Sequence, residues 1–180
     1  MKYKAYAQFI GYFLAALLLV FLQLGFVSGL PDGARGVDLI MIFLLILLVV
    51  TDLKTAFILT VLCGYFMDSF SFQPFGVYLI SYSLTVLVAY FFLVSFFTNR
   101  SQYSFLALVG LSTLFYGLFL RISDAVFSLS LGQAPHYAMS IEGGLGLAAR
   151  LALNLLVALL SFQFVNFASH RLKPVFIFKG

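Results

Sequence analysis

The sequence has little of what water-soluble proteins and disulfide-stabilised proteins depend on. Charged residues make up only 9% of its 180 residues, whereas 63% are hydrophobic. Soluble globular domains have about 25% charged and about 45–50% apolar residues, so this composition excludes a water-soluble domain. Cys63 is the only cysteine, which excludes an intrachain disulfide and a cysteine metal cluster.

Signatures of catalysis and metal binding are also scarce. The chain has two histidines, His136 and His170, no H-E-x-x-H motif and no cluster of carboxylates suited to Mg²⁺. We therefore expect that the protein is not an enzyme, and that it has no catalytic residue, no metal site and no cofactor. The net charge of +4 does not indicate a nucleic-acid partner, because the cations flank apolar stretches, where anionic lipid and membrane insertion explain them.

What the sequence does have is apolar stretches, six of which fill nearly the whole chain. A membrane crossing needs roughly 20 apolar residues. The pattern predicts an all-α integral membrane protein, a single domain over residues 1–180 with six transmembrane helices. The predicted spans are residues 5–30, 37–50, 55–70, 76–98, 103–131 and 142–168, and residues 169–180 are expected to form an interfacial cytoplasmic tail.

The cations predict the orientation of these spans. If each stretch crosses once, only Arg35 falls on one side, and seven cations fall on the other: Lys2, Lys4, Lys54, Arg100, Arg171, Lys173 and Lys179. Because Lys and Arg are enriched in cytoplasmic loops, we expect both termini in the cytoplasm.

Four ionisable residues are expected inside the outer half of the membrane: Asp68, Arg121, Asp124 and Arg150. Arg121 and Asp124 are three residues apart and are expected to be neighbours on one helix. Arg150 lacks an acidic partner on its own helix, and a buried charge needs one. The sequence leaves two candidates for its partner, Asp68 and Asp124.

The segment from Gly64 to Gly76, GYFMDSFSFQPFG, is followed by an apolar span and then by Asn99-Arg100. This arrangement resembles the signature of the rod shape-determining protein MreD family, with an aspartate at a helix end and then Pro-x-Gly opening the next helix. Asp68, Pro74 and Gly76 match that motif.

The resemblance implies a non-catalytic scaffold of the bacterial cell-wall elongation complex, or elongasome. Such a protein lies in the bacterial cytoplasmic (inner) membrane, supports peptidoglycan synthesis and maintains cell shape with a bitopic MreC-like partner. The hairpin that contains Asp68, Pro74 and Gly76 is the expected partner hairpin.

The implied fold is similar to that of the six-helix substrate-binding subunits of energy-coupling-factor transporters, which gives the alternative function: a vitamin-binding membrane subunit. Gln133, His136, Tyr137 and Arg150 are the residues that could line its pocket.

Overall fold

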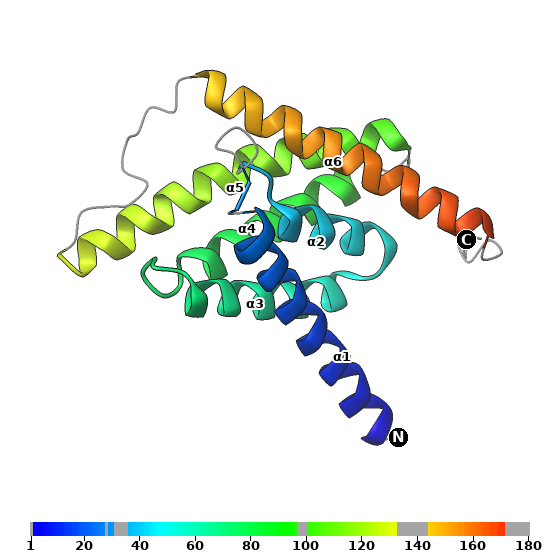
Figure 1. The fold of residues 1–180 in the computed structure, drawn as a ribbon, viewed down its shortest axis with the longest axis horizontal. Coiled ribbons are helices and arrows are strands. Elements are labelled where there is room, and N and C mark those ends of the chain that lie inside the picture. Colours follow the sequence, from blue (N-terminus) through cyan, green and yellow to red (C-terminus); the bar gives the residue numbers. More distant parts are fainter. Residues whose placement is uncertain (1, 28, 31–35, 97–100, 133–143, 172–180) are drawn as a thin grey trace.

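The computed structural model of the protein describes residues 2–27, 29–30, 36–96, 101–132 and 144–171. They form six α-helices, without a strand in these ranges, so the predicted all-α architecture is confirmed (Figure 1). The helices are α1 (Lys2–Phe21), which continues as a π-helical segment (Leu22–Val27), α2 (Leu39–Val50), α3 (Leu53–Phe70), α4 (Val77–Ser95), α5 (Gln102–Ser130) and α6 (Gly144–Arg171).

Four of these helices contain a stretch that is long and apolar enough to cross a membrane. The stretches are Ile10–Val27, Leu53–Phe70, Val77–Ser95 and Gln102–Ser130. The chain is therefore suited to be a multi-pass membrane protein. That α2 and α6 also cross remains a prediction, because Leu39–Val50 and Ala148–Gln163 are shorter apolar helices.

The short helix α2 lies at the centre of the bundle and contacts every other helix (Figure 1). Its sequence, LIMIFLLILLVV, has no polar residue on any face, and a helix that is apolar all round is stable only when it is buried. Ile40, Leu44 and Leu45 are accordingly without solvent exposure. At 1.5 Å per residue α2 is about 18 Å long, which is shorter than a hydrocarbon core of about 30 Å.

Helices α3 and α4 approach each other closely at Gly64. A Cβ atom added to this buried glycine would lie 2.6 Å from the Cα atom of Leu79. Close helix contact through small residues is typical of membrane proteins, where packing replaces the hydrophobic effect as the main source of association.

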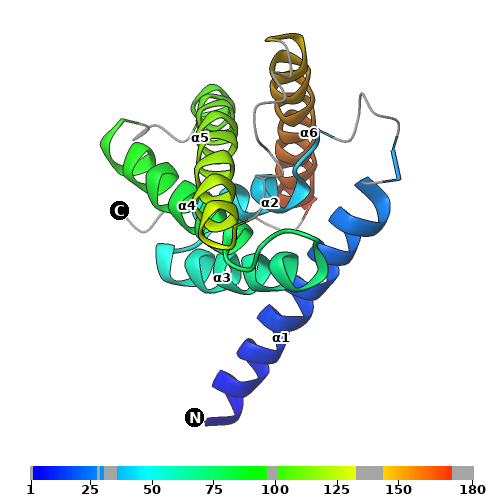
Figure 2. The same cartoon turned by 90° about the vertical axis from the view of Figure 1, so that its left-hand side faces the viewer.

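Of the four helices that contain a stretch long enough to cross a membrane, α1 is the least enclosed by the protein. It leans away from the bundle, and its N-terminal end extends beyond the other helices (Figures 1 and 2). Only 17% of Ile10–Val27 is buried, against 44% of Leu53–Phe70. Most of the α1 surface is therefore left for lipid or for another protein.

The predicted tail begins inside a helix, because α6 continues to Arg171. The remainder of that tail, from residue 172, lies outside the described residues, and so do residues 133–143 between α5 and α6.

Candidate functional site

The motif formed by Asp68, Pro74 and Gly76 includes a cap on helix α4, which Asp68 provides. The carboxylate of Asp68 accepts hydrogen bonds from the backbone N–H groups of Gly76 at 3.0 Å, Tyr78 at 2.8 Å and Leu79 at 3.0 Å. Tyr78 and Leu79 belong to the first turn of α4, where backbone N–H groups have no partner within the helix, and Gly76 directly precedes this turn. The negative charge also lies at the positive end of the helix dipole. Asp68 thus joins the end of α3 to the start of α4.

Gly76 permits the turn between these two helices. Its φ angle is +105°, in the left-handed region that L side chains rarely adopt. A Cβ atom there would also lie 3.0 Å from the ring of Phe127 on α5. The turn is closed by the N–H group of Val77, which donates to the carbonyl oxygen of Pro74 at 3.3 Å.

Residues outside the motif form the exposed surface of the hairpin. Asp68 and Gly76 are buried and Pro74 is half-buried, whereas Phe72 is 99% exposed and Phe75 is 57% exposed. The motif residues therefore shape the hairpin, and two phenylalanine rings face away from the protein.

The predicted charge cluster is spread over two helices. Asp124 on α5 is fully buried and accepts a hydrogen bond from the Ser128 hydroxyl at 3.1 Å, while Arg121 is exposed. Arg150 on α6 is exposed, and its aliphatic carbons lie against Gly36, where a Cβ atom would collide with them.

The identity of the acid that pairs with Arg150 stays a prediction. The structure does show that Asp68 is engaged by three backbone amides of α4. Of the residues considered for a vitamin pocket, only Arg150 is described, because Gln133, His136 and Tyr137 lie outside the described residues.

A further buried carboxylate, Asp38, was not singled out by the sequence. Its Oδ1 atom accepts the N–H group of Met41 at 2.8 Å and so caps the start of α2. The hydroxyl group of Tyr82 on α4 donates to the same carboxylate, at 3.2 Å from Oδ1 and 3.0 Å from Oδ2. The ring of Tyr82 stacks on that of Tyr116 from α5, with 4.8 Å between the centroids.

Two side-chain amides complete this Asp38 cluster. In the π-helical segment that continues α1, Gln23 accepts the N–H group of Leu39 and donates to the carbonyl oxygen of Val37, both at 2.9 Å. On α6, the Oδ1 atom of Asn154 accepts the N–H group of Asp38 at 3.0 Å. The segment that opens α2 is therefore hydrogen-bonded to α1, α4 and α6.

The Asp38 cluster holds the start of α2 in a fixed position against the neighbouring helices. Its carboxylate and backbone groups are satisfied by protein donors and acceptors, as buried polar groups must be. The signal in the sequence was the isolated polar side chain within each apolar stretch, since a polar residue in a membrane helix normally faces a partner.

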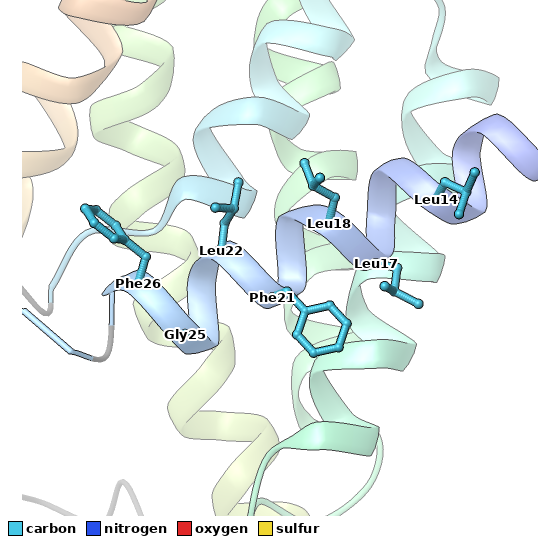
Figure 3. A pocket seen from close by; sticks show the side chains of 7 residues that line it. All are labelled: Leu14, Leu17, Leu18, Phe21, Leu22, Gly25 and Phe26. Carbon is cyan, nitrogen blue, oxygen red and sulfur yellow. The ribbon is translucent and has the colours of Figure 1, made fainter.

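The π-helical end of α1 borders an apolar groove on the outer face of that helix. The groove is open along its length, has a volume of about 630 Å³, and is lined by residues of α1 and of the π-helical segment that follows it. On one side, Leu14, Leu18, Leu22 and Phe26 form a row; on the other side lie Leu17, Phe21 and Gly25 (Figure 3). This surface, the α1 groove, offers shape and apolar contact and contains no charged group.

Within the described ranges, no group of three or more His, Cys, Asp or Glu residues could hold a metal ion. Comparisons of the chain with models of protein families, with curated proteins and with solved structures gave no match.

Proposed function

We propose that this protein is a non-catalytic membrane scaffold of the bacterial cell-wall elongation complex, in which it maintains cell shape with a bitopic MreC-like partner. The observation that carries the proposal is the hairpin between α3 and α4. Asp68 and Gly76, two of the three residues behind the resemblance to the MreD family, act there as one unit: the first caps α4 and the second makes the turn.

The arrangement of the interior supports a scaffold. Asp38 and Asp68 are both committed to helix starts, with their oxygens directed at backbone amides and, for Asp38, at a tyrosine hydroxyl. Groups used in this way hold helices in fixed positions. Polar contacts and close packing are also the interactions by which helices associate within a bilayer.

Depletion of the protein in a rod-shaped bacterial host tests the function. We expect the cells to become round, and we expect an MreC-like protein to be recovered with the tagged chain from gently solubilised membranes. Cells that stay rod-shaped but lose the uptake of one vitamin would support the alternative function. Together with recovery of transporter ATPases, this result would show that the protein is the substrate-binding subunit of an energy-coupling-factor transporter.

The contribution of the hairpin is tested by complementation. A chain carrying Asp68→Asn should restore rod shape less well than the parent, because the cap on α4 loses its charge. Asp52→Asn is the matched control: Asp52 precedes α3, is exposed and makes no side-chain cap hydrogen bond. If both variants restore rod shape equally well, the Asp68 cap of the hairpin does not contribute to this function.

A further inference from the structure

The helices around α2 form a ring that is open on one side. Helix α1 contacts α3, α3 contacts α4, α4 contacts α5, and α5 contacts α6. Among the described residues, neither α1 nor its π-helical continuation contacts α6, and the two helices lie apart in both views (Figures 1 and 2). The side of α2 between α1 and α6 is therefore not closed by another described helix.

One face of α2 remains accessible, although the helix is apolar all round. The side chains on this face are three or four residues apart, and we term them the α2 row: Leu39, Phe43, Ile46 and Val50. Phe43 is 37% exposed and Val50 is 42% exposed, while the other two are half-buried. Because every other neighbouring pair in the ring is in contact, the α2 row faces the opening between α1 and α6.

The limited exposure of the α2 row favours a thin occupant. Each side chain in the row is more than half covered by the protein itself, whereas Phe91 on the outer surface of α4 is 60% exposed. A helix with its side chains is about 10–12 Å wide and packs on side chains that stand clear of their neighbours. An acyl chain is much narrower than a helix, and the α2 row offers it apolar contact without a polar group.

A cation lies beside the end at which α2 begins. Arg150 on α6 is exposed, and its aliphatic carbons lie against Gly36, which directly precedes the segment that opens α2. Arg150 is one turn before Asn154, so the two residues share a face of α6. Asn154 binds the N–H group of Asp38, which places this face of α6 against the start of α2.

The guanidinium group of Arg150 suits the phosphate of a lipid headgroup. It carries five N–H donors in a planar fork that matches phosphate, so it can bind a phosphate in addition to partners within the protein. The sequence predicts Arg150 in the outer half of the membrane, and a long arginine side chain there extends toward the headgroups. The carboxylate of Asp38 is engaged by Tyr82 on α4 instead.

We propose that one phospholipid molecule is bound at the opening between α1 and α6, with its phosphate group at Arg150 and an acyl chain along the α2 row. This lipid closes the open side of the ring. It differs from the surrounding bilayer because a defined contact holds its headgroup. The inference goes beyond the proposed function and does not depend on it.

Lipid retention by the full chain tests the headgroup contact. The protein is purified in detergent, phosphatidylglycerol is added, and the retained lipid is measured by native mass spectrometry. We expect one lipid per chain for the parent and about tenfold weaker retention for Arg150→Gln, a loss of roughly 1.4 kcal/mol. Glutamine keeps the three aliphatic carbons that lie nearest Gly36. The matched control is Arg121→Gln, which removes an exposed arginine from α5 and should leave retention unchanged.

Two further ligands identify the phosphate as that of a lipid. Diacylglycerol has the same acyl chains without a phosphate, so the parent should retain it about tenfold less than phosphatidylglycerol. Inorganic phosphate should not displace the bound phosphatidylglycerol, because it lacks the acyl chain that contacts the α2 row. The comparison of these ligands on the parent protein also decides the inference if Arg150→Gln fails to fold.

Photo-crosslinking locates the acyl chain. A photoreactive phenylalanine analogue at Phe43 should link to phosphatidylglycerol in the parent and about tenfold less in Arg150→Gln. The same analogue at Phe91 faces the surrounding lipid on α4 and should link to it equally in both proteins.

Three results would overturn the inference. Links from Phe43 to lipid that do not depend on Arg150 would show that the ordinary bilayer covers the α2 row. Links from Phe43 to a second copy of the chain would show that protein covers it. Equal retention of phosphatidylglycerol by the parent and Arg150→Gln, or of phosphatidylglycerol and diacylglycerol by the parent, would show that Arg150 holds no headgroup.

Discussion

At the scale of single residues, two of the buried carboxylates in this protein, Asp38 and Asp68, are stabilised by helix starts. Asp38 lies at the start of α2 and Asp68 reaches the start of α4, so each meets backbone N–H groups that would otherwise be unpaired. A charge in an apolar interior is costly, and several donors are needed to offset its loss of hydration. Each carboxylate therefore also fixes the position of a helix.

We expect Asp68→Asn to lower the stability of the protein by about 1–3 kcal/mol. The amide keeps the size of the side chain but loses the charge and one acceptor, and three N–H groups converge on this position. Unfolding in detergent micelles measures the change, with Asp52→Asn as the control. An unchanged unfolding midpoint would show that the cap does not contribute to stability.

Tyr82→Phe should destabilise the protein by a similar amount, about 1–3 kcal/mol. The variant keeps the ring that stacks on Tyr116 but removes the hydroxyl group that donates to the buried Asp38 carboxylate. The control is Tyr90→Phe on the same helix, where the side chain is 38% exposed. If both variants unfold at the parent midpoint, the hydrogen bond between Tyr82 and Asp38 is not a stabilising one.

At the scale of helices, α3 and α4 approach each other closely at Gly64. Gly64→Ala should separate the two helices, because the added Cβ atom meets backbone atoms of Leu79, which cannot turn aside as a side chain can. Overpacking of this kind costs about 1–3 kcal/mol. The control Gly117→Ala enters open space and should be neutral or stabilising, since alanine favours the helix. Equal unfolding midpoints would refute the close contact.

Sequence reasoning predicted the helices well and their polar contacts poorly. The apolar stretches gave α2 to α5 with nearly the observed bounds, because a run without charge has few alternatives to a buried helix. Asp68, Pro74 and Gly76 were found because they are close in the sequence. The Asp38 cluster was missed because Asp38 and Asn154 are 116 residues apart, and no local spacing reveals which helices will be neighbours.

At the scale of the whole molecule, the distribution of cations predicts the orientation in the membrane. We expect alkaline phosphatase fused after Gly180 to be inactive, and the same enzyme fused after Gly132 to be active, because the enzyme works only outside the cytoplasm. Strong activity from the fusion after Gly180 would contradict the six-span arrangement. Inactivity of both fusions would mean that α5 does not reach the outer face.

The hydrogen bond between Asp38 and Asn154 has a consequence for biosynthesis. Asp38 is synthesised 116 residues before Asn154. Its backbone N–H group therefore lacks the Asn154 acceptor until α6 has been made. A chain that ends before α6 would keep an unsatisfied N–H group at the start of α2, and incompletely closed intermediates are prone to aggregate. A finished protein therefore differs from a truncated one in that α6 supplies the acceptor for the Asp38 N–H group, and a truncated chain exposes that group to membrane proteases.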